Sequence, residues 1–395
     1  MKILLTHRYF WPDSPNCGQI LWNLVKHYSS KGYMVDVITS LPSYNHNSKK
    51  IFSKKKEKLN NLKIRRIELL VEGNSPFKKL INAIRLGLWT NYLAIKGNYD
   101  IIISTSIPPI SGGFFAALAS YITKARFIYF CMDLHPEIGK ISKDFSNPLL
   151  FMLLKKIDNW SCSRARPVVV HSLDMKNTIL SRGIKKKPEI KIINNFSIPT
   201  ESLNKPFSSK DLQLNNAKLK IIFAGNLGRF QALDKIIDAM ALLRNKKDIK
   251  LILVGDGSIK KKLMLKIKKS MANVHLLNRQ PIDITKEIIK KADIGLVSLD
   301  SNIYKYGYPS KLMTYLEQGK PIAAVLEKES EIAKLIENEN CGFCIPTLES
   351  EKIAQYFVKL TKNDSWKLKM SNNATNVYKK YFTRSKIYDE WSKIL

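Results

Sequence analysis

The residues best suited to chemistry are Pro309, Ser310 and Lys311, in the second half of the chain. Proline suits the first turn of a helix, and the start of a helix presents free backbone N–H groups, here beside a hydroxyl and an ammonium. Gly319 and Pro321 indicate the end of that helix, and the apolar run after them indicates a buried strand. Residues 306–325 therefore predict a loop, a short helix and a strand, with phosphate as the commonest anion at such a helix start. The alternative is an ordinary capped helix with a solvent-exposed lysine.

A second glycine-bearing loop, residues 225–231, repeats this arrangement earlier in the chain. Its glycines would let the backbone approach a ligand closely, and the delocalised cation of Arg229 suits phosphate oxygens. Both loops follow predicted strands, so we expect them to open at one edge of one sheet, facing a crevice between domains. Arg229 and Lys311, with two helix starts, would neutralise a diphosphate without a metal ion. The sequence also lacks a convincing D-x-D motif or His/Asp cluster, so we expect neither a metal nor another cofactor.

Three ionisable residues, Asp133, His135 and Glu137, follow the predicted strand Arg126–Met132. Ligands of open α/β sheets bind outside the carboxyl ends of the strands. These three side chains are therefore candidates for facing a bound substrate. For His135, which precedes a proline, a purely structural role in the loop is an equal alternative.

The elements that must position these residues alternate between strand and helix. The apolar spacing predicts a strand at Lys2–Thr6, a helix at Gln19–Ser30 and a strand at Met34–Thr39. The alternation continues to a strand at Ile190–Ile193 and begins again at Leu219–Ala224. This pattern predicts an α/β protein with two Rossmann-like domains, each a doubly wound parallel sheet.

The domain boundaries follow from a loss of periodicity in residues 196–217, which carry Pro199, Pro206 and several Ser and Asn residues. We expect residues 1–197 to form the N-terminal domain, 198–217 the linker and 218–379 the C-terminal domain. Residues 380–395 are expected to join the N-terminal domain. The first predicted loop lacks G-x-G-x-x-G and has only Gly18 near the start of its helix, which weakens a dinucleotide-binding interpretation.

The composition narrows the class of partner. A net charge of +33 over 395 residues favours anionic partners, namely nucleic acid, an anionic membrane surface or a phosphorylated substrate. No apolar run reaches the roughly 18–20 residues that cross a bilayer, and the early charges argue against a signal peptide. Five scattered cysteines indicate free thiols in a reducing compartment, and Cys341-Gly-Phe-Cys344 is expected to be a turn followed by a strand. These features predict a cytosolic protein.

Two segments are candidates for contact with a membrane surface. Residues 48–66 hold nine Lys or Arg residues and are either a flexible basic loop before the strand Lys63–Leu70 or a contact for lipid phosphates. Residues 77–96 have apolar side chains at helical spacing, with Trp89 among them and basic residues at the edges. We expect this helix to pack on the sheet, with part of the apolar stripe left for lipid.

The order of these segments resembles the retaining glycosyltransferases of family GT4, which have the GT-B fold. The closest resemblance is to the branch that builds bacterial O-antigen and capsule units, including fucosamine transferases. It covers nearly the whole chain, and it depends on the order of individually weak motifs. The matching segments are the first loop ending at Gly18, residues 31–37, 105–109, 133–137, 194–195, 225–231, 254–257, 309–312 and 319–321.

The resemblance implies that the C-terminal domain binds a nucleoside-diphosphate sugar and that the N-terminal domain binds an acceptor. Asp133, His135 and Glu137 would be the catalytic residues facing the reacting centre. Arg279 or Gln280 would lie near the nucleobase. The donor-binding residues it implies are Gly18, Gly225, Asn226, Arg229, Gln231, Arg279, Gln280, Pro309, Ser310, Lys311 and Thr314.

The sequence departs from this family at two positions. The family commonly carries two glutamates eight residues apart, and the matching positions here are Tyr306 and Thr314. Glu317 lies one turn further along the same predicted helix. The usual carboxylate contacts to the donor sugar are therefore in question.

We expect a retaining transfer from a UDP-linked sugar, such as an N-acetylated deoxy sugar, to a polyprenyl-diphosphate-linked saccharide of O-antigen or capsule. The leaving phosphate would accept the proton of the acceptor hydroxyl. The enzyme would lie on the inner face of the cytoplasmic membrane. A GT-B nucleotide-sugar epimerase and a basic nucleic-acid-binding protein are the alternatives, although no nucleic-acid-binding motif supports the second.

Overall fold

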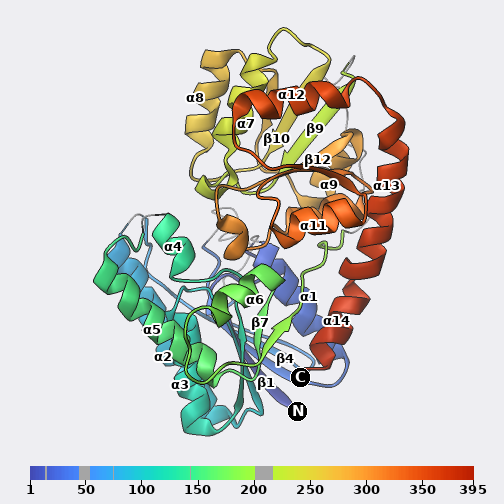
Figure 1. The fold of residues 1–395 in the computed structure, drawn as a ribbon. Coiled ribbons are helices and arrows are strands. Elements are labelled where there is room, and N and C mark those ends of the chain that lie inside the picture. The colour runs from blue at the N-terminus through green and yellow to red at the C-terminus, as the bar shows by residue number, and fades with distance from the viewer. Residues whose placement is uncertain (14–15, 44–53, 74, 143, 201–216) are drawn as a thin grey trace. The chain divides into compact units, whose positions relative to one another are not determined.

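The computed structural model describes residues 1–13, 16–43, 54–73, 75–142, 144–200 and 217–395, which form two compact units (Figure 1). The first unit contains Met1–Asn194, Tyr306–Tyr308 and Ile387–Leu395. The second contains Asn195–Lys305 and Pro309–Lys386. Most of the predicted linker, residues 201–216, lies outside the described residues.

The first unit is built on an eight-stranded sheet with the order β3-β4-β2-β1-β5-β6-β7-β8. All neighbouring strands are parallel except β3 and β4, which are antiparallel. The strand order reverses between β1 and β5, the position at which doubly wound sheets bind ligands. The strands are β1 (Lys2–Thr6), β2 (Met34–Ser40), β3 (Lys56–Leu59), β4 (Leu62–Ile67), β5 (Ile101–Thr105), β6 (Arg126–Phe130), β7 (Val168–Val170) and β8 (Ile190–Ile192).

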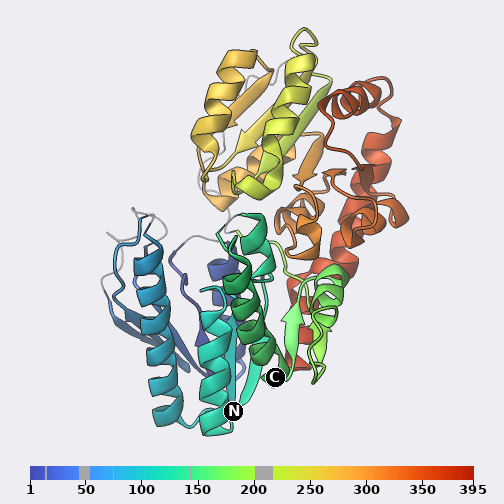
Figure 2. The same ribbon diagram turned by 60° about the vertical axis from the view of Figure 1, so that its left-hand side comes forward.

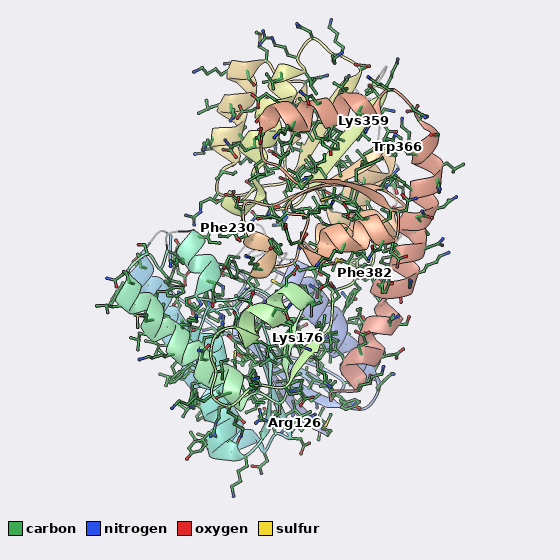
Figure 3. All side chains as sticks on the ribbon, viewed as in Figure 1. Arg126, Lys176, Phe230, Lys359, Trp366 and Phe382 are labelled. Carbon is green, nitrogen blue, oxygen red and sulfur yellow. The ribbon has the colours of Figure 1, made fainter. Side chains whose placement is uncertain are left out.

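Helices cover both faces of this sheet because the buried strands have apolar side chains on both sides. Leu4 points into the core that α2, α3 and α5 close, and these helices lie side by side (Figure 2). Ile3 and Leu5, on the opposite face, pack near Leu24 of α1 and Trp391 of α14. The helices are α1 (Asn16–Ser30), α2 (Pro76–Gly97), α3 (Ser111–Thr123), α4 (Glu137–Ile141), α5 (Pro148–Arg164), α6 (Leu173–Leu180) and α14 (Arg384–Ser392). Arg126, which begins β6 (Figure 3), donates a hydrogen bond to the carbonyl of Leu395.

The second unit has a six-stranded, fully parallel sheet with the order β11-β10-β9-β12-β13-β14. Its order reverses between β9 and β12. Helices α7, α8 and α12 supply much of one buried core, while α9, α10 and α11 contact β9, β12 and β13. The strands are β9 (Leu219–Ala224), β10 (Ile249–Val254), β11 (Val274–Leu277), β12 (Ile294–Ser298), β13 (Ile322–Val325) and β14 (Gly342–Ile345). The helices are α7 (Leu233–Leu242), α8 (Lys260–Ser270), α9 (Ile282–Lys291), α10 (Lys311–Glu317), α11 (Glu331–Asn338), α12 (Ser350–Leu360) and α13 (Ser365–Val377).

Two local predictions need correction. The basic segment 48–66 is not a single loop, because Lys56–Leu59 forms strand β3, which Asn60, with φ of 49°, turns back onto β4. The rest of the predicted loop, up to residue 53, lies outside the described residues. Pro309 lies before the helix rather than inside its first turn, since α10 begins at Lys311.

No helix in the described ranges is long and apolar enough to cross a membrane. Helix α2 contains the segment 77–96, for which an amphipathic helix was predicted. Its buried side includes Leu86, Leu93 and Ala94, and its other side stays exposed.

Candidate functional site

The predicted phosphate loop of the second unit lies where the strand order reverses. Residues 225–231 follow β9, and α10 follows β12, the strand that pairs with β9. Parallel strands end at the same edge, so the loop and the start of α10 lie next to each other. The prediction that 225–231 and 309–311 open at one sheet edge is therefore confirmed for this unit.

Tyr315 fixes α10 against the end of β9. Its hydroxyl oxygen accepts a hydrogen bond of 2.7 Å from the backbone N–H of Ala224, and its ring is fully buried. A Cβ on Gly295 of β12 would lie 2.5 Å from this ring, so only glycine leaves room for it. Sequence reasoning missed Tyr315, although a tyrosine on the buried side of the predicted helix was a visible signal.

Lys311 meets three residues of the loop and its preceding strand. Its Nζ lies 2.6 Å from Oε1 of Gln231 and 4.3 Å from the centre of the Phe223 ring. A Cβ on Gly225, where φ is 150°, would lie 3.2 Å from the Lys311 Cε. Burial lowers the pKa of Lys311 to about 7. The structure thus brings together the predicted residues Gly225, Gln231 and Lys311 around an ammonium that has no carboxylate within 4.0 Å among the described residues.

The remaining loop residues surround this ammonium less closely. Asn226 is exposed, and its side-chain amide lies over Gly228 and Gly257, where added Cβ atoms would meet it at 2.8 and 2.5 Å. Arg229 is exposed and begins a short 3-10 helix, Arg229–Gln231. Arg229 thus lies in the loop that packs against Lys311.

Four other predicted donor residues occupy different places. Arg279 and Gln280 follow β11, at the same sheet edge but two strands away from β9. Gln280 Nε2 donates a 3.3 Å hydrogen bond to the carbonyl of Asn278. Pro309 is buried and Ser310 is half-buried immediately before α10.

Thr314 and Glu317 belong to a second polar cluster, which they form with Ser197 and Lys286. Thr314 Oγ1 lies 3.5 Å from the hydroxyl of Ser197, which donates a 2.7 Å hydrogen bond to Glu317 Oε2. The same carboxylate oxygen is 2.6 Å from Nζ of Lys286, a buried ammonium that also donates to the carbonyl of Ile198. Glu317 is thus held in an ion pair within the second unit.

The first unit gathers polar side chains at its own strand reversal. His7 follows β1, and its Nδ1 lies 2.6 Å from Oγ1 of Thr105 at the end of β5. Ser106 Oγ accepts hydrogen bonds from the backbone N–H groups of Met132 and Asp133, at 3.1 and 3.2 Å. Sequence reasoning missed His7, although it follows a strand directly, as Asp133 nearly does.

Burial shifts the pKa values of three side chains in this part of the first unit. It lowers the pKa of His7 to about 3 and that of His135 to about 4, so both imidazoles are neutral near pH 7. It raises the pKa of Asp133 to about 6. Asp133 is therefore a carboxylate that can take or release a proton close to neutral pH.

Gly18 follows Cys17 in the first turn of α1. Burial raises the pKa of the adjacent Cys17 thiol to about 12, with smaller contributions from the charges of Asp133 and Asp13. A Cβ on Gly18 would lie 2.6 Å from the carbonyl oxygen of Tyr9. Glycine thus allows the start of α1 to pack against the loop after β1.

Glu137 forms an ion pair with the buried Arg182. Arg182 donates to both oxygens of Glu137, at 2.9 and 2.6 Å, and Nη1 lies 2.5 Å from Oδ2 of Asp158. Arg182 also donates a 2.8 Å hydrogen bond to the carbonyl of His135. The arginine therefore joins the loop after β6 to α5, and sequence reasoning missed it.

Tyr306 is also part of the first unit. Its carbonyl accepts a 2.8 Å hydrogen bond from the N–H of Leu134, and Gly307 bridges to Asp133. A Cβ on Gly307 would lie 2.8 Å from Oδ1 of Asp133. The backbone next to a position expected to carry a glutamate thus packs against the Asp133 loop.

Comparisons with known proteins agree with this arrangement. Residues 204–377 match the family described as "Glycosyl transferases group 1". The chain is 25% identical to a probable glycosyltransferase, WbjE, of Pseudomonas aeruginosa over 67% of both chains. It is 27% identical to an uncharacterized glycosyltransferase of Methanocaldococcus jannaschii, over 85% of this chain and 84% of the relative. The structure of Anabaena HepE in complex with UDP has a TM-score of 0.72 at 17% identity, covering 100% of this chain and 99% of HepE.

The structural likeness confirms the predicted fold, two Rossmann-like parallel-sheet domains of the GT-B type. Both relatives found by sequence are named as glycosyltransferases, one as probable and one as uncharacterized. Residues 204–377 thus match the group 1 glycosyltransferase family, and relatives named as glycosyltransferases match the chain along most of its length.

Proposed function

We propose that the enzyme is a retaining glycosyltransferase that moves a sugar from a UDP-sugar to a polyprenyl-diphosphate-linked saccharide in O-antigen or capsule synthesis. The observation that carries the donor assignment is the packing of Lys311 against Gln231 and Gly225 at the strand reversal of the second unit. The complex of HepE with UDP supports a uridine donor by analogy. Tyr306 and Thr314, in place of acidic residues, favour a donor sugar bound with fewer carboxylate contacts.

In this proposal, the second unit stabilises the leaving group. Breaking the bond between the anomeric carbon and the phosphate oxygen leaves a nucleoside diphosphate with added negative charge. Lys311 and Arg229 would bind that charge more strongly in the transition state than in the bound donor, which lowers the barrier. Contacts with Gln231 and the Phe223 ring already hold the Lys311 amine in place, so little reorganisation is needed.

The first unit would bind the acceptor. The acceptor hydroxyl forms the new bond to the anomeric carbon on the face that the diphosphate leaves, and its proton passes to the leaving phosphate oxygen. Asp133 and His135 would orient or polarise that hydroxyl. The two hydrogen bonds from Arg182 favour a positioning role for Glu137.

A donor screen followed by a transfer assay tests the proposal. A bound donor raises the thermal unfolding temperature by mass action, so UDP-sugars should stabilise the protein more than other nucleotide sugars. The best donor is then incubated with a polyprenyl-diphosphate saccharide, and the anomeric configuration of the product is determined by NMR. Inversion of the anomeric centre, or transfer only to a soluble acceptor, would contradict the proposal. Interconversion of the donor sugar without an acceptor would favour the epimerase alternative.

The pKa of Lys311 predicts proton uptake on donor binding. At pH 8 the Lys311 side chain, with a pKa of about 7, is mostly the neutral amine. A bound diphosphate favours its charged form, the ammonium. We therefore expect UDP binding at pH 8 to take up a proton in part, and UDP affinity to fall as the pH rises above 7. Calorimetry in buffers of different ionisation enthalpy measures the uptake. The same uptake in Lys311→Met would show that another group is responsible.

The exposed side of α2 supports a membrane-surface location for the enzyme. Phe77, Leu80 and Leu88 are 70%, 57% and 57% exposed, and Lys78 and Lys79 lie beside them. An apolar stripe with basic edges suits the interface of an anionic bilayer. This surface belongs to the unit that would bind the lipid-linked acceptor.

Removing apolar surface from α2 should weaken membrane binding. We expect Leu80→Gln/Leu88→Gln to lower affinity for vesicles containing phosphatidylglycerol about tenfold, and added salt to weaken binding of the unchanged enzyme. Vesicle cosedimentation measures both. The matched control is Leu265→Gln/Leu368→Gln, which alters two leucines that are 71% and 74% exposed on the second unit. Equal losses in the two double variants would contradict a specific role of α2 in membrane binding.

A further inference from the structure

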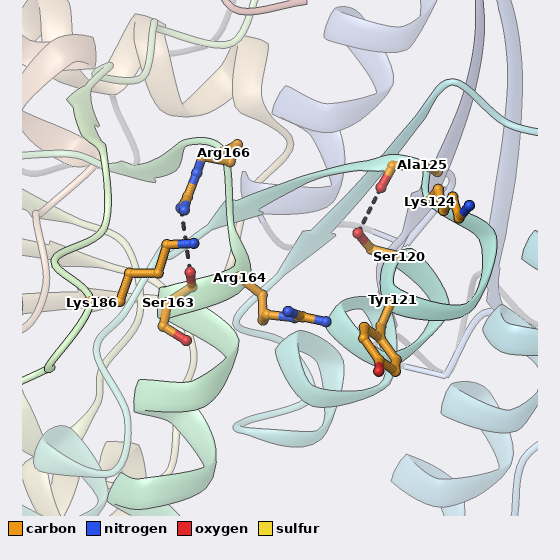
Figure 4. Close-up of a pocket in the computed structure, with 8 residues that line it drawn as sticks. All are labelled: Ser120, Tyr121, Lys124, Ala125, Ser163, Arg164, Arg166 and Lys186. Atoms are coloured by element: carbon orange, nitrogen blue, oxygen red, sulfur yellow. Dashed lines mark hydrogen bonds between the residues drawn. The ribbon is translucent and has the colours of Figure 1, made fainter.

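We infer that the first unit has a second anion site, which binds a phosphate-bearing ligand at the amino edge of its sheet. The site is an open pocket of about 400 Å³ between the ends of α3 and α5 (Figure 4). Its lining residues precede β6 and β7 in the chain, whereas the Asp133 loop follows β6. The pocket is therefore at the opposite sheet edge from the candidate catalytic residues. This inference does not depend on the proposed donor or acceptor.

Four cationic side chains line the pocket, namely Lys124, Arg164, Arg166 and Lys186. None of the four has a carboxylate within 4.0 Å among the described residues. Four like charges that share one pocket repel each other, and a bound anion would offset that repulsion. Some other lysines and arginines of this basic chain do have acidic partners, such as Arg66, Lys266 and Lys380.

The arginines are held in position by contacts that need no anion. The guanidinium of Arg164 lies 4.4 Å from the centre of the Tyr121 ring and 5.9 Å from that of Trp160, and Figure 4 shows it directed towards Tyr121. Arg166 donates hydrogen bonds to the carbonyls of Ser163 and Ala165, at 3.3 and 2.7 Å. Stacking leaves the N–H edge of Arg164 for a ligand, because cation–π contact uses only the face of the guanidinium.

The hydrogen-bonding groups favour phosphate over a neutral ligand. The hydroxyls of Ser120 and Ser163 donate to the carbonyls of Ala125 and Trp160, so the donors left for a ligand are mainly the cations. Arginine pairs with phosphate through two parallel N–H···O bonds, and lysine adds a point charge. A phosphate group on a lipid head or free in solution presents the same oxygens.

The side chains beside the pocket bear on whether the phosphate belongs to a lipid headgroup or to a soluble molecule. Tyr121 and Ile122, at the end of α3, are 66% and 53% exposed, so apolar surface adjoins the cations. A lipid headgroup would place its acyl chains near such surface, whereas a soluble phosphate would not use it. Two probes can therefore separate the sources.

The test compares two double variants that each remove two positive charges. Arg164→Gln/Lys186→Gln changes the pocket, while Lys185→Gln/Lys187→Gln changes two exposed lysines on either side of Lys186 that do not line it. Both are made in a Lys311→Met background, which removes the candidate donor ammonium. Binding is measured for inorganic pyrophosphate by phosphorus NMR, and for vesicles of phosphatidylglycerol with phosphatidylcholine by cosedimentation.

We expect the pocket variant to lose about tenfold more affinity than its control for at least one probe. A selective loss for vesicles identifies a lipid phosphate, and a selective loss for pyrophosphate identifies a soluble one. Equal losses in the two variants, or no binding of either probe before the pocket is changed, would overturn the inference. Thermal unfolding of both variants verifies that the first unit stays folded.

Discussion

Lys311→Met is expected to lower the turnover of sugar transfer about 100- to 1000-fold, the usual effect of losing one fixed donor to a developing oxyanion. The ammonium is held by Gln231 and by the ring of Phe223 beside the loop that would receive the diphosphate. Its interaction strengthens as charge moves onto the leaving group, so the loss should appear in kcat as well as in kcat/KM. Steady-state kinetics with the donor found by the screen measure both.

The stability of this variant separates a catalytic loss from a folding defect. Burial disfavours the ammonium, since the folded-state pKa of about 7 lies below the unfolded value of 10.5. The unfolded chain therefore binds more protons between these two values, and Lys311 makes the native state less stable there than above pH 10.5. Methionine removes that cost, so the variant should unfold at the same temperature or higher at pH 8.

Two further variants complete this test. Arg229→Ala should also lower turnover, because its exposed guanidinium adjoins the same loop. Lys235→Met, at an exposed position on α7, removes an equal charge and should leave turnover unchanged. Turnover close to that of the unchanged enzyme in Lys311→Met would contradict the phosphate-site assignment.

The placement of loop 225–231 beside Lys311 could be predicted from the sequence because its signals are local. Gly225 and Gln231 lie within seven residues of each other, and Lys311 begins a helix bounded by Gly319, where φ is 61°. Each part could be interpreted alone, and the strand order of a doubly wound sheet then brings the parts together. The alternation of strand and helix is also a local signal, and it predicted most strands of both sheets.

The parts that escaped prediction depend on partners far away in sequence. The bond between Tyr315 and Ala224 spans 91 residues, and that between Arg182 and Glu137 spans 45. Strand β3 was missed because lysines that look like a loop also suit an edge strand, where charge discourages pairing with another chain. Glu317 illustrates the same limit, since nothing in its own helix indicates that it pairs with Lys286.

Arg182 is expected to carry the largest single contribution to the stability of the first unit. Its guanidinium is buried between Glu137 and Asp158, and Tyr129 donates a 2.8 Å hydrogen bond to the same aspartate. Removing one partner of a buried ion pair leaves the other charge uncompensated, which typically costs about 3–5 kcal/mol. We therefore expect Arg182→Met to lower the free energy of unfolding by about that amount.

The measurement must allow for two units that can unfold separately. Urea titration should be compared on the transition that Leu93→Ala, a change in the core of the first unit, also shifts. Lys187→Met, which removes an exposed charge nearby in sequence, should change that transition by less than about 0.5 kcal/mol. A similarly small change in Arg182→Met would contradict the buried-network assignment.

The double variant Arg182→Met/Asp158→Asn tests the mechanism behind the loss. Burial already raises the pKa of Asp158, while Arg182 opposes that rise, so removing Arg182 should raise the pKa further. An acid whose folded-state pKa exceeds its unfolded value loses stability as the pH rises, so the defect of Arg182→Met should be larger at pH 8 than at pH 5. Asn at position 158 cannot ionise, so the double variant should recover part of the lost stability and lose most of that pH dependence. If the double variant is instead as unstable as the sum of both single changes at each pH, the two side chains are not coupled, and the loss comes from the contacts of Arg182 with Glu137 and the His135 carbonyl.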